Sequence, residues 1–91
     1  MTTSYHTLAL DTTQDNVLVV RLNRPQASNA MNTRMGEELM DLFERFQLDT
    51  GGIRAIVLTG TGEKAFCAGG DLKERNGMTD EQWLRQHAMF E

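Results

Sequence analysis

The sequence contains one cysteine, one proline and no long apolar stretch. A single cysteine cannot form a disulfide within the chain, which fits a reducing compartment, and we expect a cytoplasmic protein. No uninterrupted apolar run is longer than Val17–Val20, whereas a helix that spans a bilayer needs roughly 20 apolar residues. The opening stretch "MTTSYHTLAL" also lacks the charged start and apolar core of a signal peptide. We therefore expect no membrane partner.

Positive charge is scarce as well. Nine Lys and Arg residues face thirteen Asp and Glu residues, which gives a formal net charge of -4. Nucleic-acid binding depends on clustered Lys and Arg that neutralise phosphates, so we expect no nucleic-acid partner. The 91 residues suffice for at most one small domain, and 40% hydrophobic and 24% charged residues are ordinary for a folded protein.

The first half of the chain shows a strand, helix and strand pattern. "YHTLAL" and "NVLVVRLN" flank the polar turn "DTTQDN" and predict a hairpin, the second strand being apolar enough for burial on both faces. Asn32 or Thr33 can cap a following helix, and Gly51-Gly52 can end it. "IRAIVLTG" predicts the next strand. The order favours a layered α/β fold in which the helix covers the sheet. Apolar residues at helical spacing are Met31, Met35, Leu39, Leu42, Phe43 and Phe46.

Two further helices are predicted by their capping residues. Asp71 with Glu74 resembles a capping box, as does Thr79 with Gln82, and Gly77 separates the two helices. The apolar pattern of the last helix continues to the end of the sequence without a stop signal. From this pattern we expect the domain to continue.

The stretch "KAFCAGGDLKE" places two glycines directly before an Asp-capped helix. Free amides at a helix start point outward where the helix dipole is positive, which favours an anion. Without a Cβ on Gly69 or Gly70, a ligand oxygen could approach the backbone as an oxyanion hole requires. The alternative, that the glycines only turn the chain, is left open by spacing alone.

Other functional interpretations start from neighbouring residues. "GTGEKA", Gly60 to Ala65, fits the dinucleotide-binding pattern G-x-G-x-x-A, and Asp80 stands where a ribose-binding acid is expected. That interpretation needs a helix that opens at Gly62, which Gly69-Gly70 would interrupt. Cys67 has no histidine near it in sequence, which favours a buried small residue over a nucleophile.

Two longer stretches resemble the enoyl-CoA hydratase/isomerase, or crotonase, superfamily. They are "LNRPQASNAMN" at Leu22 to Asn32 and "IVLTGTGEKAFCAGGDLKE" at Ile56 to Glu74. Within the superfamily, "DLKER" favours a resemblance to methylglutaconyl-CoA hydratases. The resemblance implies repeated ββα turns wound into a spiral, with residues 1–91 forming its N-terminal part. It also implies homotrimers or hexamers and an acyl-CoA substrate, with coenzyme A as part of the substrate, no separate cofactor and no metal.

The same resemblance implies roles for individual residues. The Gly70 amide would be one of two oxyanion-hole donors that hold the thioester oxygen. Residues implied to bind the substrate are Gln26, Ala27, Ser28, Ala68, Asp71, Leu72 and Lys73, the first three at the CoA adenine and ribose. The family's second donor and its acid/base carboxylates correspond to no residue of this chain, so the 91 residues alone are expected to be inactive.

The function implied is therefore an enoyl-CoA hydratase, which adds water across a 2,3-double bond. The alternative within the family is an isomerase that shifts this bond, since both reactions pass through a thioester enolate. A non-catalytic interaction fragment is the alternative from another class. Glu74, Glu81 and Glu91 match no catalytic position of the family and are expected as exposed helix carboxylates.

Overall fold

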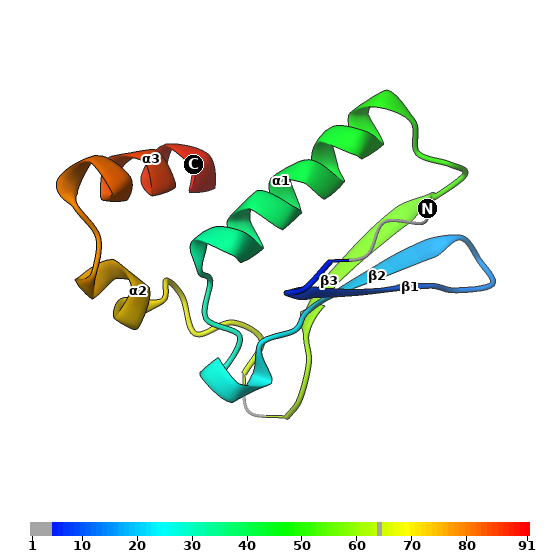
Figure 1. The fold of residues 1–91 in the computed structure, drawn as a ribbon. Coiled ribbons are helices and arrows are strands. Elements are labelled where there is room, and N and C mark those ends of the chain that lie inside the picture. The colour runs from blue at the N-terminus through cyan, green and yellow to red at the C-terminus, as the bar shows by residue number, and fades with distance from the viewer. Residues whose placement is uncertain (1–4, 64) are drawn as a thin grey trace.

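The computed structural model describes residues 5–63 and 65–91, and Figure 1 shows their arrangement. Three strands form one sheet in the order β1-β2-β3, with β1 antiparallel and β3 parallel to β2. The α/β prediction is confirmed. The elements are β1 Leu8–Thr12, β2 Val17–Leu22, the 3-10 helix η1 Pro25–Ala27, α1 Thr33–Leu48, β3 Ala55–Gly60, α2 Leu72–Asn76 and α3 Asp80–Phe90.

The strands β1 and β2 and the helix α1 form one ββα unit, after which β3 adds to the sheet. The predicted hairpin is present, with Leu8 paired to Leu22 and Thr12 to Leu18. The helix α1 then returns the chain so that β3 pairs in parallel with β2, from Val17 opposite Ala55 to Leu22 opposite Gly60. A parallel pair needs such a crossover, because a tight turn can join only antiparallel strands.

The core lies between one face of the sheet and α1. Alternate residues of β2 are buried because successive side chains of a strand point to opposite faces. The expectation that β2 is buried on both faces is wrong for the described residues, since Val17, Val19 and Arg21 remain half-exposed on the face that α1 does not cover. The buried hydrophobic residues are Leu8, Leu18, Val20, Leu22, Met35 and Leu42.

The start of α1 is capped as predicted, whereas the helix ends at Leu48 with Asp49 as its C-cap, before the predicted Gly51-Gly52. The Asn32 side chain accepts a hydrogen bond from the Met35 amide at 2.9 Å, which confirms Asn32 as the cap. After Leu48 the chain turns through Gly51 and Gly52, whose φ angles of 59° and 87° suit glycine. The predicted apolar face of α1 is confirmed in part, because Phe43 is exposed.

The two short helices lie near the first turn of α1, as Figure 1 shows. The Asp71 side chain caps α2 and Thr79 caps α3 in a capping box with Gln82, both as predicted. The helices α1 and α3 are in contact at Gly36, where an added Cβ would displace the side chains of Phe90 and Met89. No helix within residues 5–63 and 65–91 is long and apolar enough to cross a membrane.

A buried carboxylate joins α1 to the segment before β1. Glu38 Oε1 accepts hydrogen bonds from the Thr7 amide at 2.8 Å and the Thr7 hydroxyl at 2.6 Å, and Oε2 accepts one from the His6 amide at 3.0 Å. Burial would raise the pKa of Glu38, but these hydrogen bonds outweigh it and lower the pKa below its ordinary value of 4.5. The folded protein therefore favours the ionised form.

Replacing Glu38 by glutamine is expected to weaken the fold at pH 7 and to reduce its sensitivity to acid. A carboxyl whose pKa is lowered on folding stabilises the protein above its unfolded pKa, and this stabilisation disappears as the pH falls through the folded value. Loss of charge-assisted hydrogen bonds should lower the free energy of unfolding by about 1.5 to 3 kcal/mol at pH 7. Urea denaturation between pH 7 and 3 measures both effects. The neighbouring Glu37 is exposed, so Glu37→Gln is the matched control, and equal pH dependence in both variants would contradict this role.

Candidate functional site

The two motifs that carry the family resemblance meet beside the end of the sheet. The Met31 amide donates to the Gly69 carbonyl at 2.7 Å, and the Asp71 amide donates to the Met31 carbonyl at 3.0 Å. These bonds form a short parallel bridge between Met31 and Gly70. In this geometry the N–H and C=O of Met31 face Gly69 and Asp71, while the N–H and C=O of Gly70 point away from Met31.

The Gly70 amide is therefore free to bind an external acceptor. It donates no hydrogen bond to any residue in the described part of the chain. It stands one residue before Asp71, the cap of α2, so it lies at the outward-facing start of this short helix. A backbone N–H presented in this way can hold an oxygen that carries negative charge.

The two glycines of the pair differ in backbone angle and in what a side chain would meet. Gly69 has a φ of 93°, and a Cβ at Gly69 would meet nothing within 4 Å, so this glycine serves the backbone turn. Gly70 does not have a left-handed φ, but a Cβ there would collide with the guanidinium of Arg75. The turn interpretation thus accounts for Gly69, whereas a side chain at Gly70 would only have to displace the flexible end of Arg75.

Arg75 places a positive charge directly against Gly70. Its guanidinium lies where a Gly70 side chain would be, and its Nε donates to Gln86 Oε1 at 3.3 Å. Gln86 is buried at 3% exposure and anchors this side chain to α3. A guanidinium beside the free amide adds to the attraction for an anionic oxygen.

Asp71 serves the scaffold of the site. Its Oδ1 accepts from the Glu74 amide at 3.1 Å, and its Oδ2 accepts from Arg24 Nη1 at 2.9 Å. The hydrogen bond from the Glu74 amide and then that from Arg24 lower the pKa of Asp71 below its ordinary value. Both oxygens of the ionised carboxylate thus have protein partners.

The other residues implied to bind substrate fall into two groups. Gln26, Ala27 and Ser28 lie in and directly after η1, where Ser28 adopts a left-handed φ of 52°. Ala68, Leu72 and Lys73 surround Gly70 in the chain and are exposed, Leu72 at 73%. The bridge between Met31 and Gly70 brings the two segments to one side of the molecule. Cys67 is only half-buried, which corrects the expectation of a buried residue.

The dinucleotide interpretation of "GTGEKA" is wrong. Gly62 has a φ of 88° and opens no helix, because the helix that follows β3 starts only at Leu72. Gly60 is needed for close approach, since a Cβ there would meet the carbonyl oxygens of Ala65 and Phe66 and the Asn29 side chain. Lys64, which belongs to this motif, lies outside the described residues.

Asn29 is a structural residue of the site that the sequence did not single out. It is 1% exposed and has a left-handed φ of 56°. Its Oδ1 accepts from the Arg24 amide, and its Nδ2 donates to the carbonyl oxygens of Thr61 and Ala65, each at 2.9 Å. Asparagine tolerates this φ better than most residues, so its place just after the "RPQAS" turn is a signal that could have identified it.

Glu74 corrects another expectation. Its Oε1 accepts from the Thr33 amide at 2.7 Å, the Thr33 hydroxyl at 2.8 Å and Gln86 Nε2 at 2.7 Å. It is therefore a half-buried link between α1, α2 and α3, not an exposed helix carboxylate. Glu81 and Glu91 are exposed as expected.

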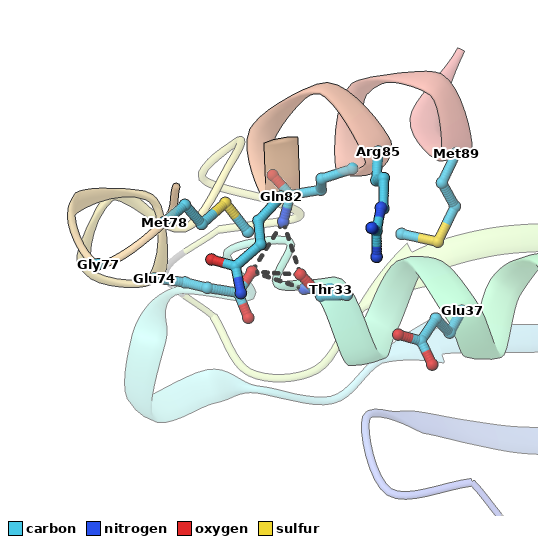
Figure 2. A pocket seen from close by; sticks show the side chains of 9 residues that line it. Thr33, Glu37, Glu74, Gly77, Met78, Gln82, Arg85 and Met89 are labelled. Atoms are coloured by element: carbon cyan, nitrogen blue, oxygen red, sulfur yellow. Dashed lines mark hydrogen bonds between the residues drawn. The ribbon is translucent and has the colours of Figure 1, made fainter. Parts of the chain in front are cut away.

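Two of the cavities near these residues bear on the candidate site. The one of about 490 Å³ is shown in Figure 2, where Thr33 and Glu74 are joined by hydrogen bonds and Arg85 and Met89 point in from α3. Gly70 is not among its lining residues, so it is not the space in front of the free amide. The smaller, of about 210 Å³, lies between η1 and the Thr61–Ala65 loop, and Ser28 lines it.

Comparison with known proteins identifies the family. A sequence profile described as enoyl-CoA hydratase/isomerase matches residues 12–91. The chain is 40% identical over 77 residues to YngF of Bacillus subtilis (strain 168), a candidate enoyl-CoA hydratase/isomerase, with 85% of this chain and 29% of YngF covered. It is 44% identical over 62 residues to carnitinyl-CoA dehydratase of Proteus mirabilis (strain HI4320), with 68% and 23% covered. The chain thus spans less than a third of these relatives.

Solved structures agree with the sequence match. An enoyl-CoA hydratase from Bacillus anthracis superimposes with a TM-score of 0.86 at 37% identity, and 92% of this chain covers 32% of that one. The enoyl-CoA hydratase from Mycobacterium smegmatis gives a TM-score of 0.81 at 38% identity, with the same coverage of both chains. The α/β arrangement is therefore that of crotonase-fold enzymes, as predicted. This chain belongs to the enoyl-CoA hydratase/isomerase family.

Proposed function

We propose that the Gly70 amide binds the thioester oxygen of an acyl-CoA substrate. The observation that carries this proposal is the orientation of the amide, which faces away from Met31 and has no acceptor within residues 5–63 and 65–91. The Arg75 guanidinium beside it favours negative charge at the same place. The family membership of the chain supports a thioester as the ligand.

We further propose that the protein at its full natural length is an enoyl-CoA hydratase. Water adds to C3 of the 2,3-double bond, the electron pair moves to the thioester oxygen to give an enolate, and a proton then adds to C2. The negative charge on oxygen grows during the first step, so a fixed amide donor lowers its barrier. An isomerase, the second candidate, would remove a proton from C4 of the 2-enoyl thioester to give a dienolate on the same oxygen, and a proton added at C2 would then leave the double bond between C3 and C4.

Proton transfer requires groups other than those near Gly70. Among the described residues, Asp71 and Glu74 are the nearest carboxylates in sequence, and both are held by hydrogen bonds that serve the scaffold. We propose that acid/base carboxylates and the second amide donor lie outside these 91 residues, as the family resemblance implies. Reaction by the chain alone is therefore not expected.

The nucleotide end of the substrate is proposed to bind at Gln26, Ala27 and Ser28. The small cavity beside η1 supports this assignment, because Ser28 lines it. The exposed Lys73 follows in sequence two residues after the capping Asp71 and could contact a phosphate. A homotrimer or hexamer, a cytoplasmic location and the absence of nucleic-acid partners remain predictions.

Titration calorimetry tests the proposed substrate class. The protein at its full natural length is expected to bind acetoacetyl-CoA, because this ligand presents both a thioester oxygen and the nucleotide. NAD at the same concentration should give no heat, since the helix that a dinucleotide motif requires is missing after Gly62. Free CoA is the control for the contribution of the thioester. Binding of NAD without binding of acetoacetyl-CoA would refute the proposal.

A further inference from the structure

Arg24 connects the two segments of the candidate site. It immediately precedes η1, and its Nη1 donates to the Ala30 carbonyl at 2.7 Å and to Asp71 Oδ2 at 2.9 Å. The side chains of Arg24 and Asp71 are only 17% and 13% exposed. Shielding from water makes such a pair stronger and less dependent on salt than a surface ion pair.

The turn from Arg24 to Asn29 is held by hydrogen bonds between its two end residues. The Arg24 amide donates to Asn29 Oδ1 at 2.9 Å, and the Asn29 amide donates to the Arg24 carbonyl at 2.8 Å. Between these two residues, the Ser28 amide donates to the Pro25 carbonyl at 3.2 Å. A displacement of residues 26–28 must therefore also move Arg24 or break this turn.

At the other end, Asp71 is fixed on several sides. Its amide donates to the Met31 carbonyl, its Oδ1 caps α2, and its Oδ2 accepts from Arg24. Gly70 is covalently bound to Asp71 and has no side chain of its own to fix it. The direction of the Gly70 N–H thus depends on how Asp71 is held.

We propose that Arg24 is a positioning residue that links nucleotide binding at residues 26–28 to the orientation of the Gly70 amide. The inference rests on the proposed function. Binding energy from a part of the substrate remote from the reacting atoms raises turnover when it is used to orient the catalytic groups. Through the hydrogen bond from Arg24 to Asp71, binding of the CoA nucleotide would help to orient the Gly70 amide.

The kinetic test compares two substrates in the protein at its full natural length. Arg24→Gln should lower kcat for crotonyl-CoA by about tenfold to a hundredfold, because small misplacement of a catalytic group is costly. The same variant should lower kcat for crotonyl-pantetheine, which lacks the nucleotide, less than about threefold, since this substrate gains nothing from the link. Arg54→Gln, at an exposed arginine, is the matched control and should leave both values unchanged.

Arg24→Lys tests whether the loss of kcat in Arg24→Gln comes only from loss of the positive charge. A lysine keeps the charge but not the planar group that reaches both acceptors, so partial recovery of the crotonyl-CoA rate is expected. Equal losses of kcat for the two substrates would show a merely structural role and overturn the proposal. No loss for either substrate would overturn it as well.

Nuclear magnetic resonance with adenosine 3′,5′-bisphosphate tests the link without turnover. In the parent protein this nucleotide should shift the amide signals of both Ser28 and Gly70. In Arg24→Gln the Ser28 shift should remain while the Gly70 shift disappears, and persistence of the Gly70 shift would contradict the link. A parent protein that binds neither this nucleotide nor acetoacetyl-CoA would refute the proposed function itself, and the inference with it.

Discussion

Replacement of Gly70 by proline is expected to reduce kcat by about 10² to 10³ in the protein at its full natural length. Proline has no amide hydrogen, so the proposed donor to the thioester oxygen is lost. The bridge to Met31 uses the Gly69 carbonyl and the Asp71 amide, so removing the Gly70 amide hydrogen breaks no backbone hydrogen bond of the described residues. KM should change less than kcat, because the charge on oxygen grows in the transition state.

Gly70→Ala is the matched control for this variant. Its methyl group, like the proline ring, must displace the Arg75 guanidinium, which is the end of a flexible side chain. Alanine keeps the amide, and the φ of Gly70 lies outside the left-handed region. A large loss in the proline variant together with a small loss in the alanine variant would identify the amide as the cause. Circular dichroism and thermal melting establish that both variants fold. A folded proline variant with kcat within a few-fold of the parent would refute the donor role.

Local signals in the sequence were sufficient for most of the fold. The hairpin, α1 and the capping residues Asn32, Asp71 and Thr79 follow from residues within a few positions of one another. The burial of β2 did not follow, because an apolar run does not reveal which faces of a strand are covered. That depends on where α1 and the rest of the chain pack.

The candidate site was predictable only in outline. The glycine pair indicated a free amide, but the backbone angle of Gly69 and the position of Arg75 beside Gly70 did not follow from the sequence. The role of Glu74 depends on Thr33, 41 residues earlier in the chain. Such contacts depend on the packing of distant segments, which hydrophobic periodicity and capping patterns do not specify.

Asn29→Ala is expected to lower the free energy of unfolding by about 2 to 4 kcal/mol. The side chain makes three hydrogen bonds at 1% exposure, to the Arg24 amide and the carbonyl oxygens of Thr61 and Ala65. Alanine leaves these buried groups without partners, and each such group costs about 1 to 3 kcal/mol unless water reaches it. Alanine is also disfavoured at the φ of 56° by about 1 kcal/mol. Urea denaturation at pH 7 measures the loss.

Two further substitutions separate the hydrogen bonds of Asn29 from its backbone angle. Glycine suits the left-handed φ but lacks the side chain, so Asn29→Gly should be more stable than Asn29→Ala by about 1 kcal/mol and still less stable than the parent. Aspartate has nearly the same shape, but its carboxylate would face the Thr61 and Ala65 carbonyl oxygens where the parent donates two hydrogen bonds. Asn29→Asp should therefore lose at least as much stability as the alanine variant. If Asn29→Gly or Asn29→Asp matched the parent in urea, the hydrogen bonds would not hold the two loops together, and the backbone angle alone would explain why asparagine stands at this position.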